Sequence, residues 1–510
     1  MVDAIADWSA AWAPSMIERM KWIVYPVLAI ALSVPFASAV ERSEGTIATG
    51  TEWETPWYRI ESGEPGPVLV LTGGIHGNEP AGWLAADQIR HWPIVRGTLV
   101  VLPEANRLAL AEGSRRFPGL EGDSGDLNRH FPRTDDAEKT LSPLAEEIWA
   151  FVKKQEPDWV IDLHEGFAVR RKNSKSVGST ILCDATEETR PLFEHCIATV
   201  NASIDDPENL FLLIDNSRTA NGSLVRASMD RLGAHGAILE TTYNDFAPGI
   251  RIRQHRLMVW RLLRNLEMIA NGPDDLVFED PDDPRKAIAI YYGPGAFGGG
   301  PLALRRTLRE EEERYSVRII GPEEVRNGSL EQFDLVIFPG GSGSRQAAGI
   351  GDEGQEAVRD YVRDGGGYIG ICGGCYLACE NFSWSLGILD AKTKSSKWRR
   401  GKKMLELAFS ESGRELLEPA NEVELVKYQN GPVMAPAESP TIPDFVTFAT
   451  FQTEVADNDT PEGIQVDSPA ILGGSFGRGR VVGISPHPEQ TENLTHFVPE
   501  LIEWCLEKVQ

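Results

Sequence analysis

Residues 68–80 read VLVLTGGIHGNEP, and this stretch decides how we interpret the fold of the whole chain. The apolar run at its start indicates a short buried strand, and the two glycines that follow favour a turn at the end of that strand. Runs of this kind alternate with helical stretches along the rest of the sequence, which is typical of α/β units with largely parallel sheets. We therefore predict an α/β fold.

The predicted strands fall into two series, separated by an acidic, Pro-rich stretch, NGPDDLVFEDPDDP at residues 271–284, that we interpret as a linker. We expect an amino-terminal segment at 1–39, a first domain at 45–270, the linker at 271–286 and a second domain at 287–510. The strands of the first series are Val68–Thr72, Thr98–Leu102, Trp159–Leu163, Ser179–Leu182 and Ala237–Leu239. Those of the second series are Ala287–Tyr292, Val317–Ile320, Leu335–Phe338, Tyr368–Ile371 and Val481–Ile484.

The composition excludes some classes of protein. The chain has 510 residues, 41% of them hydrophobic, so each predicted domain has enough apolar material for a core of its own. Its 50 Lys and Arg residues stand against 76 Asp and Glu residues, a formal net charge of −26. Because such a negative field repels phosphate backbones, we expect no nucleic-acid partner.

A hydrophobic run, WIVYPVLAIALSVPF at residues 22–36, follows two basic residues and precedes Ala37-Ser38-Ala39. This order is typical of a secretory signal peptide, so we expect cleavage after Ala39 and a protein exported to the periplasm or the extracellular space. A start at Met16 or Met20 would give a more typical leader. The alternative is an uncleaved anchor, which would be the protein's one association with a membrane.

Two histidines and a glutamate form a predicted zinc site. His76 and Glu79 follow the strand of residues 68–72, and His164 ends the strand of residues 159–163. The carboxyl ends of parallel strands share one edge of a sheet, where ligands bind in open α/β folds. Catalytic zinc takes three such ligands and leaves one position to water. A lone histidine at a strand end is more often structural, but three candidate ligands in a chain with nine histidines favour Zn²⁺ as cofactor.

Four motifs then appear in order: GGIHGNEP at 73–80, GDLNRHFP at 125–132, DLHEG at 162–166 and ILETT at 238–242. With these motifs the first half resembles the succinylglutamate desuccinylase/aspartoacylase branch of the zinc carboxypeptidase family. The resemblance implies a zinc-carboxypeptidase-like α/β domain. It also implies a role for each matching residue: zinc ligands His76, Glu79 and His164; a clamp for a substrate carboxylate, Asn128 and Arg129; a guanidinium near the scissile carbonyl, Arg115 or Arg116; and the catalytic glutamate, Glu240.

The chemistry of these residue types agrees with hydrolysis of an amide. Zinc polarises the acyl oxygen and lowers the pKa of water toward about 7. Glu240 would then take a proton from the water and pass it to the leaving nitrogen. The additional acid Glu165 in DLHEG would support a ligand rather than act as one.

The second half contains GGGYIGICGGCYLAC at residues 365–379, an apolar run that enters a glycine-rich turn. Small residues two places before and after Cys372 are typical of a nucleophile elbow, which exposes a thiol where a strand turns into a helix. SPHPE at residues 485–489 follows a later strand. His487 and Glu489 can therefore complete a Cys-His-Glu triad.

These residues resemble the class I glutamine amidotransferase superfamily. YYGPGAF at 291–297 and FPGGSGS at 338–344 narrow the likeness to the domain at the amino end of biotin–protein ligases. The resemblance implies a flavodoxin-like, class I amidotransferase-type α/β domain, with an oxyanion hole formed by the backbone of Gly340 and Gly341 and the N–H after Cys372. The alternative is a domain that only binds a ligand or a partner. Six cysteines also permit disulfides in an exported protein, which would silence the thiol.

The sequence thus predicts an exported zinc-dependent hydrolase that cleaves an amide bond in an N-acyl amino acid or in a peptide that carries a carboxylate. Two alternatives remain. The first is a cysteine-dependent amidase centred on Cys372, and the second is a non-catalytic extracytoplasmic binding protein that retained both pockets. The basic run KTKSSKWRRGKK at residues 392–403 is interpreted as a solvated loop, with an anionic polymer or membrane surface as its alternative contact.

Overall fold

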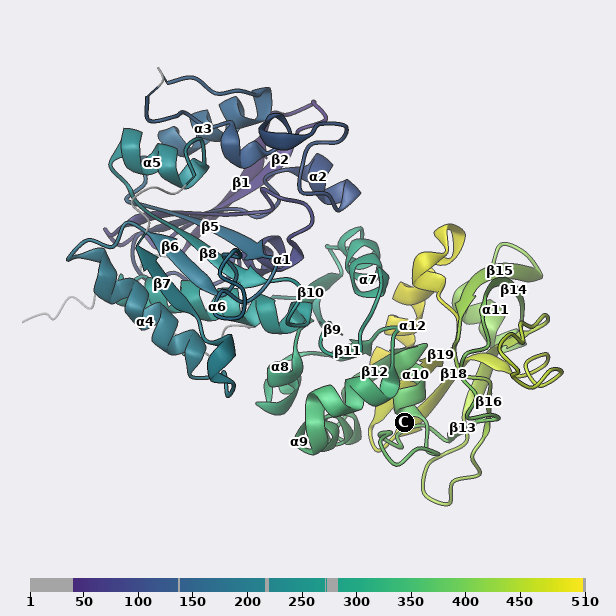
Figure 1. Ribbon diagram of the computed structural model, residues 1–510. Coiled ribbons are helices and arrows are strands. Elements are labelled where there is room, and N and C mark those ends of the chain that lie inside the picture. Colours follow the sequence, from purple (N-terminus) through teal and green to yellow (C-terminus); the bar gives the residue numbers. More distant parts are fainter. Residues whose placement is uncertain (1–39, 136–137, 216–219, 271, 273–282, 508–510) are drawn as a thin grey trace, which may run out of the picture. The chain divides into compact units, whose positions relative to one another are not determined.

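The computed structural model describes residues 40–510 except 136–137, 216–219, 271, 273–282 and 508–510. The predicted signal peptide at 1–39 and most of the predicted linker therefore lie outside the described residues. Residues 39–510 form one compact unit, which contains both of the large sheets shown in Figure 1. Within the described part of the chain, every helix is too short or too polar to cross a membrane.

The first half folds into an eight-stranded sheet in the order β1-β2-β4-β3-β5-β8-β6-β7. Strands β4, β3, β5 and β8 are parallel to one another, whereas β2 pairs antiparallel with β4, and β6 pairs antiparallel with β8. The strands are β1 (Glu41–Ile47), β2 (Thr55–Glu61), β3 (Val68–Gly73), β4 (Thr98–Leu102), β5 (Trp159–Gly166), β6 (Thr180–Cys183), β7 (Leu212–Asp215) and β8 (His235–Thr242). The helices are α1 (Pro80–Ile89), α2 (Arg107–Glu112), α3 (Pro143–Lys154), α4 (Thr189–Asn201), α5 (Leu224–Leu232) and α6 (Pro248–Asn265).

Side chains of the central strands point alternately to the two faces of this sheet, and helices cover both faces. Leu71 and Ile161 pack in one core cluster with residues of α1, α4 and α6, whereas Val70 and Val160 pack in another with residues of α3 and α5. Successive side chains of a strand point to opposite faces, so these near-continuous apolar runs serve two cores at once.

The second half folds into a nine-stranded sheet in the order β10-β9-β11-β12-β19-β18-β17-β14-β15. Its first five strands are parallel and follow the doubly wound order 2-1-3-4-5. These strands are β9 (Lys286–Tyr291), β10 (Tyr315–Ile320), β11 (Leu335–Phe338), β12 (Gly367–Ile371) and β19 (Gly479–Ile484). The antiparallel strands are β14 (Lys402–Phe409), β15 (Val423–Gln429), β17 (Val446–Phe451) and β18 (Pro469–Phe476), and a separate pair is β13 (Ala391–Thr393) and β16 (Met434–Pro436).

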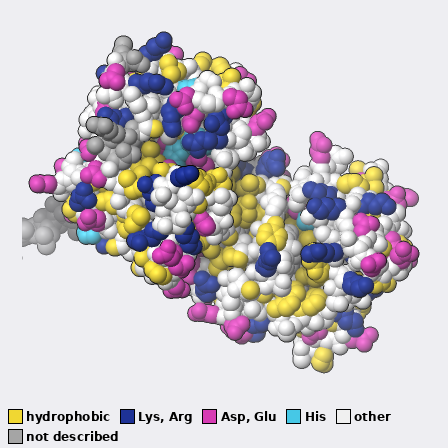
Figure 2. All heavy atoms as spheres, viewed as in Figure 1, with side chains coloured by type: hydrophobic (Ala, Val, Ile, Leu, Met, Phe, Trp, Pro, Cys, Tyr) yellow, Lys and Arg dark blue, Asp and Glu magenta, His cyan; other side chains and the backbone are white. Residues whose placement is uncertain are grey.

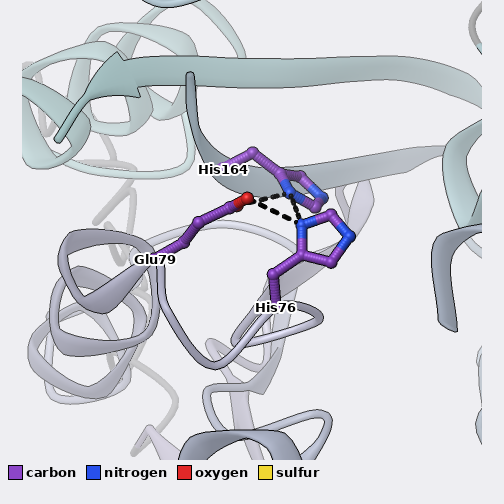
Figure 3. A group of neighbouring side chains, drawn as sticks. All are labelled: His76, Glu79 and His164. Atoms are coloured by element: carbon purple, nitrogen blue, oxygen red, sulfur yellow. Dashed lines mark hydrogen bonds and ion pairs between the residues drawn. The ribbon is translucent and has the colours of Figure 1, made fainter. Parts of the chain in front are cut away.

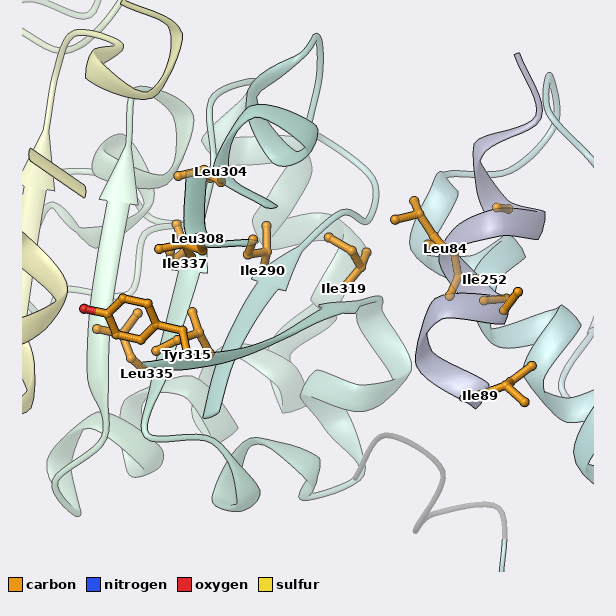
Figure 4. Packing of buried hydrophobic residues seen from close by; sticks show 14 of the residues in the cluster. Leu84, Ile89, Ile252, Ile290, Leu304, Leu308, Tyr315, Ile319, Leu335 and Ile337 are labelled. Carbon is orange, nitrogen blue, oxygen red and sulfur yellow. The ribbon is translucent and has the colours of Figure 1, made fainter. Parts of the chain in front are cut away.

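Helices cover both faces of the parallel part of the second sheet. Figure 4 shows Ile290 on β9 and Ile337 on β11 close to Leu304 and Leu308 of α7. The same picture includes Leu84, which lies on α1 in the first half. The helices of the second half are α7 (Gly300–Arg309), α8 (Pro322–Arg326), α9 (Gly343–Arg363), α10 (Gly373–Ala378), α11 (Glu411–Leu417) and α12 (Phe497–Leu506).

The α/β prediction is confirmed, and each of the ten predicted strands coincides with an observed strand within two or three residues at its ends. The expectation of largely parallel sheets is wrong for several pairings: β1 with β2, β2 with β4, β6 with β8, and the block of β14, β15, β17 and β18 are antiparallel. Antiparallel neighbours need no helical crossover between them, so the helix–strand alternation that revealed the parallel strands is missing there. On the face seen in Figure 2, acidic and basic side chains are interspersed.

Candidate functional site

His76, Glu79 and His164 converge on one point at the carboxyl edge of the first sheet. His76 and Glu79 lie in the turn between β3 and α1, and His164 lies on β5. Nδ1 of His76 is 2.8 Å from Oε1 of Glu79, and Nδ1 of His164 is 2.8 Å from Oε2. The two Nδ1 atoms are 3.1 Å apart. Figure 3 shows the three side chains pointing toward one another. Their potential ligand atoms all lie within 4.8 Å of one another.

A carboxylate behind each imidazole fixes the orientation of its ring. Nε2 of His76 lies 2.9 Å from Oδ1 of Asp126, and Nε2 of His164 lies 2.7 Å from Oδ2 of Asp162. Metal-ligating histidines characteristically donate their outer N–H to such a carboxylate, which leaves the inner nitrogen as a lone-pair donor. Two inward Nδ1 atoms and a buried carboxylate are a donor set that suits Zn²⁺.

Burial and charge act against each other in this cluster. Burial alone would raise the pKa of Glu79, but the neighbouring His76 and His164 outweigh it and hold that pKa well below its usual value. Burial likewise disfavours the imidazolium of His164, whereas the carboxylates of Asp162 and Glu79 hold its pKa well above the usual value. Three carboxylates, those of Glu79, Asp126 and Asp162, thus contact the two imidazoles, as expected for a site that balances the charge of a cation.

Glu240 lies beside the three converging side chains. Its position on β8 pairs directly with that of His164 on β5, and its side chain is buried. Burial, opposed by His164, raises the pKa of Glu240 to about 8. A carboxyl group with a pKa near neutrality can both accept and return a proton, as general acid–base catalysis requires.

The structure separates the two arginines that the sequence left as alternatives. Arg115 Nη1 donates to Oε1 of Glu79 at 2.8 Å, and its Nη2 donates to Asp126 at 3.3 Å. Arg116 instead donates from Nε to the carbonyl of Gly122 at 3.1 Å. Arg115 is therefore the guanidinium that lies at the site.

Asn128 and Arg129 occupy a short turn next to the histidines. The Asn128 amide nitrogen lies 3.3 Å from Nε2 of His164, and its Oδ1 accepts from the backbone N–H of Leu224 at 3.2 Å. Arg129 Nη1 donates to the carbonyl of Asn128 at 2.8 Å. Asn128 thus reaches the cluster with its side chain fixed, and Arg129 folds back along its own turn.

Glu165 supports the site from the opposite face of β5. Its backbone N–H donates to Oε2 of Glu79 at 3.1 Å, whereas its carboxylate accepts from the backbone N–H of Ala81 at 2.8 Å and pairs with Arg251 of α6. Neighbouring residues on a strand face opposite ways, so Glu165 supports the turn that carries the ligand Glu79.

Sequence reasoning missed the two carboxylates behind the histidines. Asp162 lies two residues before His164 on the same strand and hence on the same face, a spacing that could have revealed it. Asp126 lies inside the GDLNRHFP motif, but its partner His76 is 50 residues away, and only the folded chain brings the two together.

The second half places Cys372 at a sharp turn between β12 and α10. Its backbone has φ +49°, a left-handed conformation that non-glycine residues adopt at some cost and that is concentrated at functional sites. The turn also needs glycine, since a Cβ at Gly374 would lie 1.9 Å from the carbonyl oxygen of Phe338. The chain therefore packs tightly beneath the thiol, as a nucleophile elbow requires.

His487 and Glu489 reach Cys372 from the segment after β19, the strand that pairs with β12. Nδ1 of His487 lies 2.8 Å from Oε1 of Glu489, and Sγ of Cys372 lies 3.4 Å from the carbonyl oxygen of Gln429. Burial would lower the pKa of His487, but the adjacent Cys372 and Glu489 raise it to about 10. The three side chains have the order of a nucleophile, a base and an orienting carboxylate.

A cavity of about 290 Å³ opens above Cys372. Gly341 lines this cavity, and Gly373 directly follows Cys372. The backbone N–H groups of these two glycines donate to no other described residue, and a Cβ at Gly373 would fall 2.8 Å from the nitrogen of Gly341. The cavity is lined by Phe297, Gly298, Gly340, Gly341, Ser342, Gly343, Ser344, Cys372, Tyr376, Phe382, Trp384, Ser396, Trp398, Gln429, Asn430, His487 and Gln490.

All six cysteines are buried free thiols. Cys375 lies against Met434, and Cys379 donates to the carbonyl of Cys375. In this structure Cys372 is therefore not paired with either neighbour.

Comparison with known proteins gives two family matches. Residues 65–241 match the succinylglutamate desuccinylase/aspartoacylase catalytic domain, and residues 286–397 match the N-terminal domain of biotin–protein ligase. The first match contains all three candidate zinc ligands and Glu240. The second contains Cys372 but ends before His487.

Two relatives share parts of the sequence. The N-alpha-acetyl-L-2,4-diaminobutyric acid deacetylase of Halomonas elongata is 33% identical over 110 residues, which are 21% of this chain and 30% of the relative. An uncharacterized protein of Chlamydia muridarum is 37% identical over 104 residues, which are 19% of this chain and 39% of the relative. The chain thus spans 30% of the length of the first relative and 39% of the second.

Solved structures of low identity are also similar. Product-bound cell shape determinant protein Csd4 of Helicobacter pylori is 20% identical with a TM-score of 0.36, over 47% of this chain and 59% of the other. A succinylglutamate desuccinylase/aspartoacylase of Rhodobacter sphaeroides is 18% identical with a TM-score of 0.33, over 46% and 68%. The chain therefore combines a domain that resembles the succinylglutamate desuccinylase/aspartoacylase catalytic domain with one that resembles the N-terminal domain of biotin–protein ligases.

Proposed function

We propose that this protein is a zinc-dependent hydrolase of amide bonds whose substrate, an N-acyl amino acid or a peptide, carries a carboxylate. One observation carries the proposal: the Nδ1 atoms of His76 and His164 and the carboxylate of Glu79 face one another, while both outer imidazole nitrogens rest on carboxylates. The family match over residues 65–241 supports an amide hydrolase.

His76, Glu79 and His164 would hold the ion. When bound, zinc supplies Lewis acidity and a water that ionises near neutral pH. Glu240 accepts the proton of the attacking water and returns it to the leaving nitrogen, for which its burial beside His164 suits it. Arg115 offers a guanidinium at the edge of the cluster, where a carboxylate or a developing oxyanion can be bound.

The experiment measures the zinc content and the rate of hydrolysis on the same protein sample. We expect about one zinc per chain in protein purified without chelators, hydrolysis of N-acyl amino acids, and loss of both in the His76→Ala, His164→Ala double variant. His195→Ala, at an exposed position of α4, is the matched control. A wild-type protein that binds zinc but hydrolyses no N-acyl amino acid or peptide would favour the binding-protein alternative.

We propose a second hydrolytic centre at Cys372, because a strained elbow, a paired His487–Glu489 and a cavity meet at this thiol. A neutral alkylating agent separates the two centres. Iodoacetamide should abolish the activity of the thiol centre and leave the zinc centre intact, whereas a chelator should do the reverse.

We also propose that the protein is exported, on the basis of the apolar run at residues 22–36 and the small residues after it. Fractionation of cells that express the full chain, with amino-terminal sequencing of the product, tests this proposal. Recovery from the cytoplasm with the leader intact would contradict it.

A further inference from the structure

The cavity above Cys372 differs in chemistry from the zinc site. Its described lining contains no Asp, Glu, Lys or Arg side chain, and its polar groups are hydroxyls, amides, the Cys372 thiol and the His487 imidazole. Five aromatic side chains complete the lining: Phe297, Tyr376, Phe382, Trp384 and Trp398. In the space-filling view of Figure 2, hydrophobic side chains gather around the place that α10 occupies in Figure 1.

Phe382 and Trp384 stack on each other, and we call the outer face of this pair the aromatic wall. Phe382 and Trp384 stack with centroids 4.6 Å apart and planes 12° from parallel, and Tyr376 lies 6.2 Å from Phe382. Trp384 is fixed against the backbone of Gly343, where a Cβ would fall 2.9 Å from its ring. The position of Trp384 therefore depends on the start of α9, which comes directly after the segment of Gly340 and Gly341.

Two further aromatic side chains remain exposed at the cavity. Phe297 is 48% exposed and Trp398 is 49% exposed. The loop that carries Trp398 is fixed to the protein, since Lys397 Nζ donates to the carbonyl of Asp459 at 2.8 Å and Arg400 is buried. The basic run at residues 392–403, predicted to be a solvated loop, thus contributes an apolar side chain to the cavity.

We propose that the Cys372 cavity takes neutral acyl compounds, amides or esters, that present a flat aromatic group to the wall of Phe382 and Trp384. Aromatic faces gain about 0.5–1.5 kcal/mol from offset-stacked or edge-on partners beyond the area they bury. The inference rests on the proposed thiol centre and names its class of substrate.

The lining disfavours charged substrates. A free amino acid would bring an ammonium and a carboxylate into a cavity whose one charged lining group, His487, is already paired with Glu489, and an unpaired buried charge is costly. A cation would meet aromatic faces, but two nearly parallel rings form a single wall rather than a cage, and no carboxylate lines the cavity. Free glutamine is therefore not the expected substrate.

The reaction balances with water as its one co-reactant. With His487 already holding the thiol proton, Cys372 Sγ attacks the carbonyl carbon, and the N–H groups of Gly341 and Gly373 stabilise the oxyanion. The C–N or C–O bond then breaks, and the leaving group receives the proton from His487. Water attacks the resulting thioester with His487 as base, which releases the acid and restores the thiol.

The test compares three electrophiles that share the same reactive chloroacetamide group and differ in charge. N-Benzylchloroacetamide is neutral and aromatic, N-chloroacetylglycine is anionic, and (2-chloroacetamidoethyl)trimethylammonium is cationic. Each labelling rate at Cys372, mapped by peptide mass, is divided by the rate of the same reagent with glutathione. We expect the benzyl compound to label about two- to tenfold faster than either charged one, the effect of one aromatic contact.

Variants make the test specific. Trp398→Ala should reduce the aromatic preference severalfold and Trp398→Phe should restore it, whereas Leu425→Ala, at a position 56% exposed on β15, should leave it unchanged. Equal normalised rates, a preference for a charged reagent, or a preference that survives both Trp384→Ala and Trp398→Ala would overturn the proposal.

A turnover assay separates this inference from the function on which it rests. Hydrolysis of 4-nitrophenyl phenylacetate should be lost in Cys372→Ser and should survive chelation. A retained labelling preference without Cys372-dependent turnover would uphold the class of ligand and refute the catalytic step. Turnover without any aromatic preference would uphold the thiol centre and refute the class of ligand.

Discussion

His164 and Glu240 occupy paired positions on the neighbouring parallel strands β5 and β8. Residues in register on adjacent strands present their side chains to the same face of the sheet, so a candidate metal ligand and a candidate proton carrier lie next to each other without support from a flexible loop. The register of two strands thereby fixes the central geometry of the first site.

Removal of the proton carrier should separate catalysis from metal binding. Glu240→Gln keeps the size of the side chain but cannot accept a proton, so we expect kcat to fall by about 10²- to 10⁴-fold with the zinc content unchanged. Initial rates and elemental analysis on the same sample measure both. Glu147→Gln, at an exposed position of α3, is the control, and full activity in Glu240→Gln would contradict the role assigned to it.

Loss of the carboxylate behind His164 should weaken the metal site without removing a ligand. Asp162→Asn leaves His164 without its charged partner, and we expect zinc affinity to fall by about 10- to 100-fold. Competition with a fluorescent chelator measures the change. Asp206→Asn, an exposed carboxylate, should behave as the wild type, and equal affinity in Asp162→Asn would show that the partner does not tune the ligand.

The two adjacent arginines provide a matched pair. Arg115 contacts Glu79 and Asp126, whereas Arg116 contacts the carbonyl of Gly122. We expect Arg115→Ala to lower kcat/KM by about 10²-fold or more and Arg116→Ala to leave it within about twofold, since the Arg116 guanidinium is held by a backbone carbonyl away from the site. Equal losses in the two variants would contradict the geometry.

The elbow of the second half should tolerate no Cβ at Gly374. A methyl group there would meet the Phe338 carbonyl oxygen at 1.9 Å, so Gly374→Ala should lower the free energy of unfolding by about 3 kcal/mol or prevent folding. A Cβ at Gly299 would meet nothing within 4 Å, which makes Gly299→Ala the control. Urea titration compares them, and an unchanged midpoint in Gly374→Ala would refute the packing described for the elbow.

The triad histidine should make stability depend on pH in one direction. Cys372 and Glu489 raise the pKa of His487 to about 10, whereas an unfolded histidine titrates near about 6.5. The stabilisation from its charged form is thus complete below about pH 6.5 and is lost as the pH rises through 10. Urea titration of the wild type and of His487→Gln from pH 6 to 10 should show a stability difference that shrinks with pH. A constant difference would contradict this assignment.

Much of the framework could be predicted from sequence. The ten apolar runs predicted five strands of each sheet, because a buried parallel strand is apolar on both faces. The strands β14 (Lys402–Phe409) and β15 (Val423–Gln429) were not predicted. About half of their side chains face solvent, so both strands mix polar with apolar residues. Their place in the sheet depends on pairing with distant segments, which no local pattern reveals.

By itself, the sequence determined which residue types are available at strand ends: two histidines and a glutamate in the first half, and a cysteine between glycines in the second. Local backbone rules suffice for that, because a buried strand that runs into glycines must turn at its end. Only the tertiary structure selected Arg115 over Arg116, placed Asp126 behind His76 and surrounded Cys372 with aromatic rings. These contacts join residues from separate elements, and their distances depend on strand register and on helix packing rather than on spacing along the chain.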